Sequence, residues 1–169
     1  MEKQYQNKVS ERFLPLIEEG HEWGYKLMRR LVNPNPTALE VVEQYQYAKE
    51  NGWLSKNDAA NYNNRWLQFK GKFLGQFDRT SAFMEKHFGI KHSHVYANWI
   101  RDGHTFGRHC DTMDVIIVQM WNEVAYCVES ENQHTSFTMS PGDALYIRHG
   151  VYHTPIVIQE RATMSFSWN

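Results

Sequence analysis

The sequence predicts an α+β protein in which N-terminal helices precede a small antiparallel β-barrel or double-sheet jelly roll. Two observations lead to this prediction. In the first half, apolar side chains recur at three- and four-residue spacing between helix start and stop signals. In the second half, short segments rich in β-branched and aromatic residues are separated by tight turn signals. Helices followed by strands are typical of the α+β class.

The first two helices are expected on either side of a proline-rich turn. Ser10 is a candidate N-cap for a helix over residues 11–31. The sequence NPNP at 33–36 then breaks the helical pattern. Thr37 and Glu40 have the spacing of a capping box, in which each side chain accepts from the other residue's backbone N–H. They predict the start of a second helix at this point.

A third helical region is expected between two glycines. Gly52 has the place of a left-handed C-cap for the second helix. Ser55 and Asp58 repeat the helix start signal, and Gly89 ends the pattern. The apolar residues between them suit a stripe that faces the core: Trp66, Phe69, Phe73, Leu74 and Phe77.

The strands are expected in the second half, where turn signals recur at short intervals. Alternating or apolar segments occupy residues 95–100, 114–121, 124–129, 135–139, 144–147, 154–158 and 162–168. Glycine, asparagine and proline lie between many of them, as turns require. The whole chain is expected to form one compact unit, with a helical region over 1–92 packed on a β core over 93–169.

Composition excludes several classes of protein. Charged residues make up 22% and hydrophobic residues 41% of the 169, as in an ordinary globular domain. No stretch reaches the ~18 apolar residues of a membrane span, and the N-terminus lacks the apolar core of a signal peptide. Two cysteines, Cys110 and Cys127, provide no disulfide framework, so a cytoplasmic location is expected.

Charge gives little indication of a macromolecular partner. Residues 1–94 carry 14 Lys and Arg against 11 Asp and Glu, a net charge of +3. This excess is too small to indicate nucleic-acid binding. The N-terminal helices remain candidates for a homodimer interface.

Three residues in the second half have the pattern of a metal site. His109 and Asp111 are two positions apart, so on a strand they share one face and can bind the same ion. His153 follows a turn and can lie beside them in a folded-back β structure. Two histidines and one carboxylate that leave coordination positions open are the ligand set of non-haem Fe(II) oxygenases.

The order of motifs around these residues carries a family resemblance. The motifs are Tyr96-Ala97-Asn98, Phe106-Gly-x-His-x-Asp, Asp114-Val-x-x-x-Gln119, Pro141-Gly-Asp-x-Leu-Tyr-Ile and Gly150-Val-Tyr-His153. Over roughly residues 94–168 the chain resembles Jumonji-C-like cupin oxygenases, in particular the small ribosomal-oxygenase-like and cupin-like branch of bacteria and marine phages. The helical first half resembles nothing that we can assign.

This resemblance implies a double-stranded β-helix (cupin) fold and an oxidative activity. His109, Asp111 and His153 would hold Fe(II), and 2-oxoglutarate and O₂ would be cosubstrates. The substrate would be hydroxylated at a C–H bond. Whether it is a protein side chain or a small molecule is left open.

One departure from the family concerns the cosubstrate. The relatives usually have a lysine that pairs with the distal carboxylate of 2-oxoglutarate, and here Val124 stands in its place. A buried carboxylate needs a cation, and Arg161 is the best substitute, because Arg161 and Thr163 resemble the Arg-x-Ser pair of other 2-oxoglutarate oxygenases. Tyr96 and Asn98 share a strand face and either line the cosubstrate pocket or fill the barrel.

The missing lysine keeps two alternatives open. The first is a metal-binding cupin whose chemistry does not use 2-oxoglutarate. The second is a non-catalytic binding protein with a structural metal, although structural sites are normally closed. Two further carboxylates are expected to be structural: Asp114 in a strand-end hydrogen bond and Asp143 in a turn.

Overall fold

The computed structural model describes residues 6–54, 63–68, 72–90, 92–99, 105 and 107–168, with only the backbone described over 63–68. Within them, a short 3₁₀ helix (Gln6–Lys8) precedes three α-helices: α1 Leu14–Trp23, α2 Ala38–Glu50 and α3 Gly75–Phe88. The strands are β1 Tyr25–Met28, β2 Asn63–Gln68, β3 His92–Asn98, β4 Val115–Trp121, β5 Val124–Ser130, β6 Gln133–Met139, β7 Ala144–Ile147, β8 Tyr152–Ile156 and β9 Arg161–Ser167. The α+β class is confirmed.

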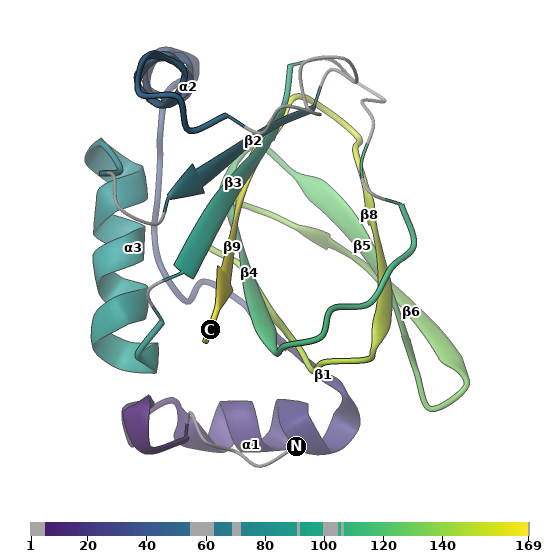
Figure 1. Cartoon of the computed structure of the whole chain (residues 1–169). Coiled ribbons are helices and arrows are strands. Elements are labelled where there is room, and N and C mark those ends of the chain that lie inside the picture. The colour runs from purple at the N-terminus through teal and green to yellow at the C-terminus, as the bar shows by residue number, and fades with distance from the viewer. Residues whose placement is uncertain are drawn as a thin grey trace.

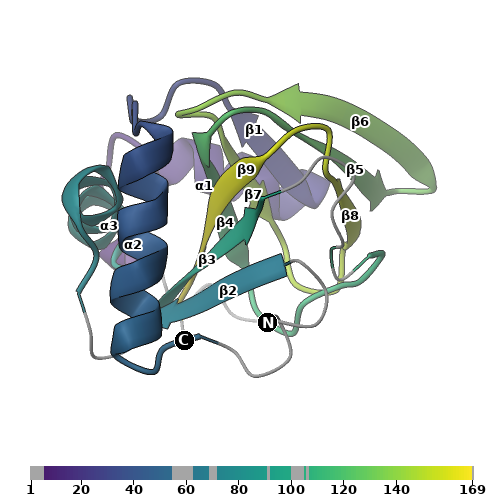
Figure 2. The same ribbon diagram turned by 90° about the horizontal axis from the view of Figure 1, so that it is seen from above.

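The strands form two antiparallel sheets that face each other (Figure 1). The larger sheet has the order β1-β7-β4-β9-β3-β2, and the smaller one has the order β6-β5-β8. Helices α2 and α3 lie on the outer side of the larger sheet and run in different directions, since Figure 1 shows α2 end-on and Figure 2 shows α3 end-on. Helix α1 lies across one end of the molecule in Figure 1. No helix among the described residues is long and apolar enough to cross a membrane.

Two apolar clusters hold these layers together. One joins the helices to the larger sheet and includes Ile17, Phe77 and Ile116. The other fills the space between the sheets and includes Ile117 and Val124. Strand β4 contributes to both clusters, so its two faces are buried. This burial explains why β4 is apolar without alternation, apart from the buried Gln119.

The first expected helix is too long, and its last part is a strand. Helix α1 begins at Leu14 and ends at Trp23, and Ser10 accepts from the first turn through its backbone carbonyl, without a side-chain cap. Gly24 follows with a φ of 95°, a left-handed conformation that glycine adopts without strain. Residues of β1 then pair in register with β7. Edge pairing in the sheet overrides the local helical pattern here.

The second helix is confirmed, but the third begins later than expected. Thr37 and Glu40 form the predicted capping box, with both hydrogen bonds present. Helix α3 starts only at Gly75, and Asn63–Gln68, which was expected to be helical, is β2 and pairs with β3. The expected start residues Ser55 and Asp58, together with Phe69, lie outside the described residues. The predicted stop is confirmed, because Gly89 caps α3 in the left-handed conformation.

The predicted strands of the second half are confirmed within a few residues at each end, as β3 to β9. Their turns follow the local sequence signals. In the Pro-Gly-Asp turn, Gly142 has a φ of 96°, and a side chain there would collide with the backbone oxygen of Val32. These short-range signals locate strands well because turn chemistry depends on adjacent residues.

Asp143 acts as the predicted turn former and also ties the turn to the N-terminal region. Its Oδ2 accepts from the Ser140 backbone N–H at 2.9 Å and from Arg29 Nη1 at 2.8 Å. Its Oδ1 accepts from the Arg30 backbone N–H at 3.0 Å. Burial acts to raise the pKa of Asp143, but these donors favour the charged form and leave the pKa below its usual value.

This lowered pKa predicts a loss of stability in acid. The ionised carboxylate stabilises the fold fully above the unfolded-state pKa of about 3.9, and that contribution disappears as the pH falls through the lower folded-state pKa. In Asp143→Asn, therefore, the deficit in the free energy of unfolding relative to the parent should shrink below about pH 4. Urea denaturation from about pH 7 to pH 3 measures it. A deficit that stays constant across this range would contradict the assignment.

Candidate metal centre

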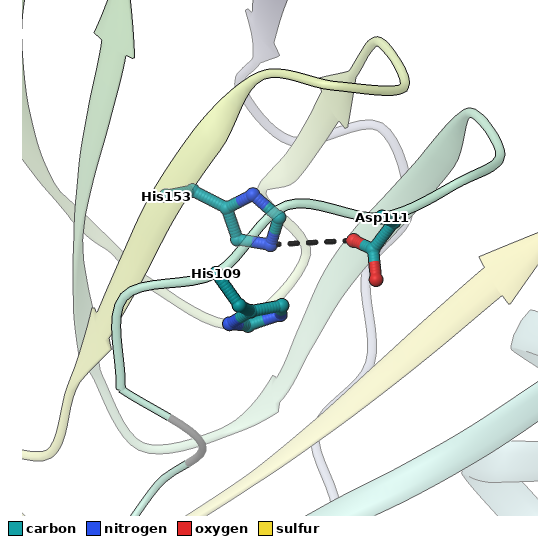
Figure 3. A group of neighbouring side chains, drawn as sticks. All are labelled: His109, Asp111 and His153. Atoms are coloured by element: carbon teal, nitrogen blue, oxygen red, sulfur yellow. Dashed lines mark ion pairs between the residues drawn. The ribbon is translucent and has the colours of Figure 1, made fainter.

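The structure brings His109, Asp111 and His153 together at the end of the space between the sheets (Figure 3). One ligand atom from each residue lies within 4.8 Å of the other two. His109 and Asp111 lie in the segment before β4, and His153 lies on β8. An isolated antiparallel bridge aligns the two histidines, with N–H···O distances of 3.0 and 2.8 Å. This bridge produces the proximity that the sequence pattern predicted.

Backbone carbonyls orient both imidazole rings. His109 Nδ1 donates to the carbonyl of Gly107 at 2.8 Å, and His153 Nδ1 donates to the carbonyl of Val151 at 3.0 Å. A neutral imidazole has one N–H, so with the proton on Nδ1 it is Nε2 that carries the lone pair with which a metal is bound. His153 Nε2 lies 3.4 Å from Asp111 Oδ2. Burial, with a further contribution from His109, lowers the pKa of His153 and favours this neutral form.

The three side chains suit an open metal site. The side chain of His153 is 3% exposed and that of Asp111 is 34% exposed, so an ion could reach the site from the Asp111 side. Two neutral nitrogen ligands and one carboxylate carry a net charge of about -1, which favours a divalent cation. The ligands come from two neighbouring chain segments and leave the remaining directions to other ligands. This set fits Fe(II), and it also fits other divalent transition metals.

A narrow pocket of about 50 Å³ adjoins the three residues and runs between the sheets. It is lined by the His-Asp-His group and by Tyr96, Thr105, Ile117, Tyr126, Pro155, Arg161 and Ser165. Among these residues, Arg161 is the one that brings a permanent positive charge. The pocket therefore combines a candidate metal site with a cation.

Arg161 is buried, with 3% exposure, and its hydrogen-bond partners among the described residues are uncharged. Its Nε donates to Asn98 Oδ1 at 2.7 Å and its Nη1 donates to Thr163 Oγ1 at 2.7 Å. Tyr126 lies close enough to Arg161 that each side chain influences the pKa of the other. Burial lowers the pKa of Arg161, although a guanidinium stays charged in proteins. In the described part of the chain no carboxylate pairs with it, and a buried charge without a counter-ion is costly.

The residues predicted for the cosubstrate pocket divide into two groups. Tyr96 and Arg161 line the pocket. Asn98 and Thr163 are fully buried and contact Arg161, but they are not among the lining residues.

The sequence reasoning missed Tyr126, which lies on β5 two residues after Val124 and therefore shares its face. Burial raises the pKa of Tyr126 to about 12, and the neighbouring Arg161 acts in the opposite direction. The phenol is therefore neutral at pH 7 and can donate its proton. One signal could have identified Tyr126 from the sequence. It places a hydroxyl on the same strand face as Val124, the position where the family usually has its anchoring lysine.

The two other carboxylates are structural, as expected. Asp114 is 2% exposed and accepts from the Tyr146 hydroxyl at 2.7 Å and from both the backbone N–H and the ring of His149 at 2.8 Å. These bonds fix the turn between β7 and β8. In the same turn, the N–H of Gly150 donates to the backbone carbonyl of Asp111. Asp114 thus supports the segment that leads to His153.

Sequence comparison and structure comparison give different results for this chain. No model of a known protein family matches the sequence, and no curated protein matches it either. Among solved structures, E. coli YcfD aligns over 89% of this chain and 51% of its own, at 16% identity and a TM-score of 0.65. A YcfD ribosomal oxygenase structure in complex with cobalt and 2-oxoglutarate gives 95% and 52% coverage at 16% identity and a TM-score of 0.61.

A second kind of oxygenase has the same fold. A Pseudomonas putida prolyl-4-hydroxylase aligns over 90% of this chain and 96% of its own, at 11% identity and a TM-score of 0.62. The chain thus spans about half the length of YcfD and almost the whole of the hydroxylase. The resemblance to ribosomal oxygenases is confirmed at the level of the fold, and this chain has the fold of these oxygenases.

Proposed function

We propose that the protein is an Fe(II)- and 2-oxoglutarate-dependent dioxygenase with a double-stranded β-helix core. The observation that carries this proposal is the buried Arg161, which has neutral partners in the described structure and shares a pocket with an open His-Asp-His group. A dicarboxylate that binds a metal with one end and a cation with the other suits both features. Its distal carboxylate would supply a counter-ion, which none of the described residues gives to Arg161.

Each residue has a separate task in this proposal. His109, Asp111 and His153 would hold Fe(II), which together with 2-oxoglutarate and O₂ supplies the oxidising power for hydroxylation of a C–H bond. Arg161 would bind the distal carboxylate with two parallel N–H groups of its fork. Tyr126 would donate its phenolic proton to the same carboxylate. The narrow pocket between the sheets would exclude water from the reacting atoms.

For the substrate, we propose only a chemical class. The fold relatives are a ribosomal oxygenase and a prolyl hydroxylase, so a protein side chain is the first candidate and a small molecule the second. The N-terminal helices are proposed as a homodimer interface.

Anaerobic reconstitution with Fe(II) tests the proposal. Addition of 2-oxoglutarate to the Fe(II)-loaded protein should produce a weak visible metal-to-ligand charge-transfer band, because the cosubstrate chelates the metal. Titration of the band gives the affinity. If Fe(II) binds and no band develops, 2-oxoglutarate is not a ligand and the proposal fails.

One observation favours a second candidate. Val124 is fully buried in the apolar cluster between the sheets, at the place where the family usually has its lysine. A metal-binding cupin that uses no 2-oxoglutarate would not need this lysine. Fe(II) binding without the charge-transfer band is the result expected of it. A non-catalytic protein with a structural metal is less well supported, because Asp111 leaves the site open to solvent.

A further inference from the structure

Thr163 lies between two inward-facing residues of neighbouring strands. It is directly opposite Tyr96 on β3 and directly opposite Gln119 on β4, so the three side chains share a face of the larger sheet. Thr163 and Gln119 are both 0% exposed. Neither is among the residues that line the pocket, whereas Arg161 is. They therefore form a layer behind the arginine.

The direction of the hydrogen bonds in this layer follows from Gln119. Its Nε2 lies 3.0 Å from the carbonyl oxygen of Trp121 and 2.7 Å from that of Asn122. Both carbonyls can only accept, so the amide nitrogen must face them. They lie where the register of β4 shifts and where Asn122 has a φ of 55°, which turns both oxygens toward the same side chain. The amide oxygen of Gln119 is thereby directed to Thr163.

This orientation decides what the Thr163 hydroxyl can do. The distance from Thr163 Oγ1 to Gln119 Oε1 is 2.6 Å, and an amide oxygen only accepts, so the single hydroxyl proton is donated to Gln119. The lone pairs of Oγ1 accept from Arg161 Nη1 at 2.7 Å. Thr163 then has no proton left for an anion in the pocket. The chain of donors runs in one direction, from Arg161 through Thr163 and Gln119 to two backbone carbonyls.

We infer that Gln119 and Thr163 are positioning residues that hold the Arg161 guanidinium toward the pocket, and that Thr163 does not contact the bound 2-oxoglutarate. This inference rests on the proposed function. It revises the sequence-based expectation, in which Arg161 and Thr163 formed a pair that binds the carboxylate together. Asn98 Oδ1 completes the support by accepting from Arg161 Nε. Arg161 lines the pocket, where its guanidinium can meet the ligand.

The variant Gln119→Met tests whether Thr163 positions Arg161 or contacts the cosubstrate itself. Methionine is similar in shape to glutamine but lacks the amide. Loss of the amide oxygen frees the Thr163 proton and loosens the support of Arg161. The dissociation constant of 2-oxoglutarate for the Mn(II)-loaded protein should rise about tenfold, the effect of one lost buried hydrogen bond. If Thr163 contacted the carboxylate directly, the freed proton would leave the affinity unchanged or increase it. Isothermal titration calorimetry measures the constant, and the Mn(II) affinity should equal that of the parent.

Variants of Thr163 provide the matched controls. Thr163→Ser keeps the hydroxyl and should bind 2-oxoglutarate as the parent does, whereas Thr163→Val should bind it about tenfold more weakly. The double variant should be no weaker than Thr163→Val alone, because both substitutions break the same chain. Strictly additive effects would overturn the inference.

A crystal structure of the parent with Mn(II) and 2-oxoglutarate decides the question even if Gln119→Met does not fold. The inference requires that Thr163 Oγ1 lie beyond hydrogen-bonding distance of every cosubstrate oxygen, and a contact of about 2.7 Å would overturn it. A parent that binds no 2-oxoglutarate overturns the proposed function and this inference together. A parent that binds it, with Gln119→Met binding equally well, overturns the inference alone.

Discussion

Replacement of His153 by alanine should abolish turnover and weaken Fe(II) binding by more than about 100-fold. Loss of a residue that only supports a metal ligand costs 10- to 100-fold, and His153 would be a ligand itself. His109→Ala should have the same effect. Asp111→Ala should also have it, unless an external anion occupies the vacant position. Anaerobic equilibrium dialysis against Fe(II) measures all three affinities.

The control for this series is His134→Ala. The side chain of His134 is 71% exposed on β6, away from the triad, so this variant should bind Fe(II) as the parent does. The melting temperatures of all four variants test whether the fold is retained. If the three triad variants bind Fe(II) as tightly as the parent, the metal assignment is wrong.

Replacement of Arg161 by alanine should weaken 2-oxoglutarate binding by about two to three orders of magnitude. The distal carboxylate would stay buried without its cation, and removal of one partner of a buried ion pair costs roughly 3–5 kcal/mol. Arg161→Lys should recover part of the affinity, because an ammonium group lacks the planar fork. Calorimetric titration of the Mn(II) form measures the loss, and Mn(II) affinity should hardly change because Arg161 is not a metal ligand.

Arg148→Ala is the matched control for this experiment. Arg148 donates to the backbone carbonyl of His21 at 2.6 Å and is not among the residues that line the pocket. Its loss should affect the packing of α1 and leave 2-oxoglutarate affinity near that of the parent. Normal binding by Arg161→Ala together with weak binding by Arg148→Ala would place the anchor elsewhere.

Local signals were sufficient for most elements of the fold. The capping box of Thr37 and Glu40, the left-handed cap at Gly89 and the Pro-Gly-Asp turn each depend on a few adjacent residues, and each is present. The strands from β3 to β9 were predicted for the same reason.

The two segments that were predicted wrongly are both edge strands. Tyr25–Met28 and Asn63–Gln68 occupy opposite edges of the larger sheet, and their residues pair with partners at least 25 positions away in the sequence. Each lies within a longer segment whose start signals and apolar residues predicted a helix. Hydrogen bonding to a distant strand outweighs such a weak local preference.

Local patterns were sufficient to locate β3 to β9, the capping box and the three candidate metal ligands, because turn residues, cap spacing and the i, i+2 spacing involve only neighbouring positions. Three features became visible only in the folded chain: the carbonyls that orient the two histidines, the proximity of Tyr126 to Arg161, and the hydrogen bond from Thr163 to Gln119. These contacts join residues from different strands. They depend on the order and register of β3, β4 and β9 within the larger sheet and on how β5 of the smaller sheet faces them. No single segment of the sequence encodes that arrangement.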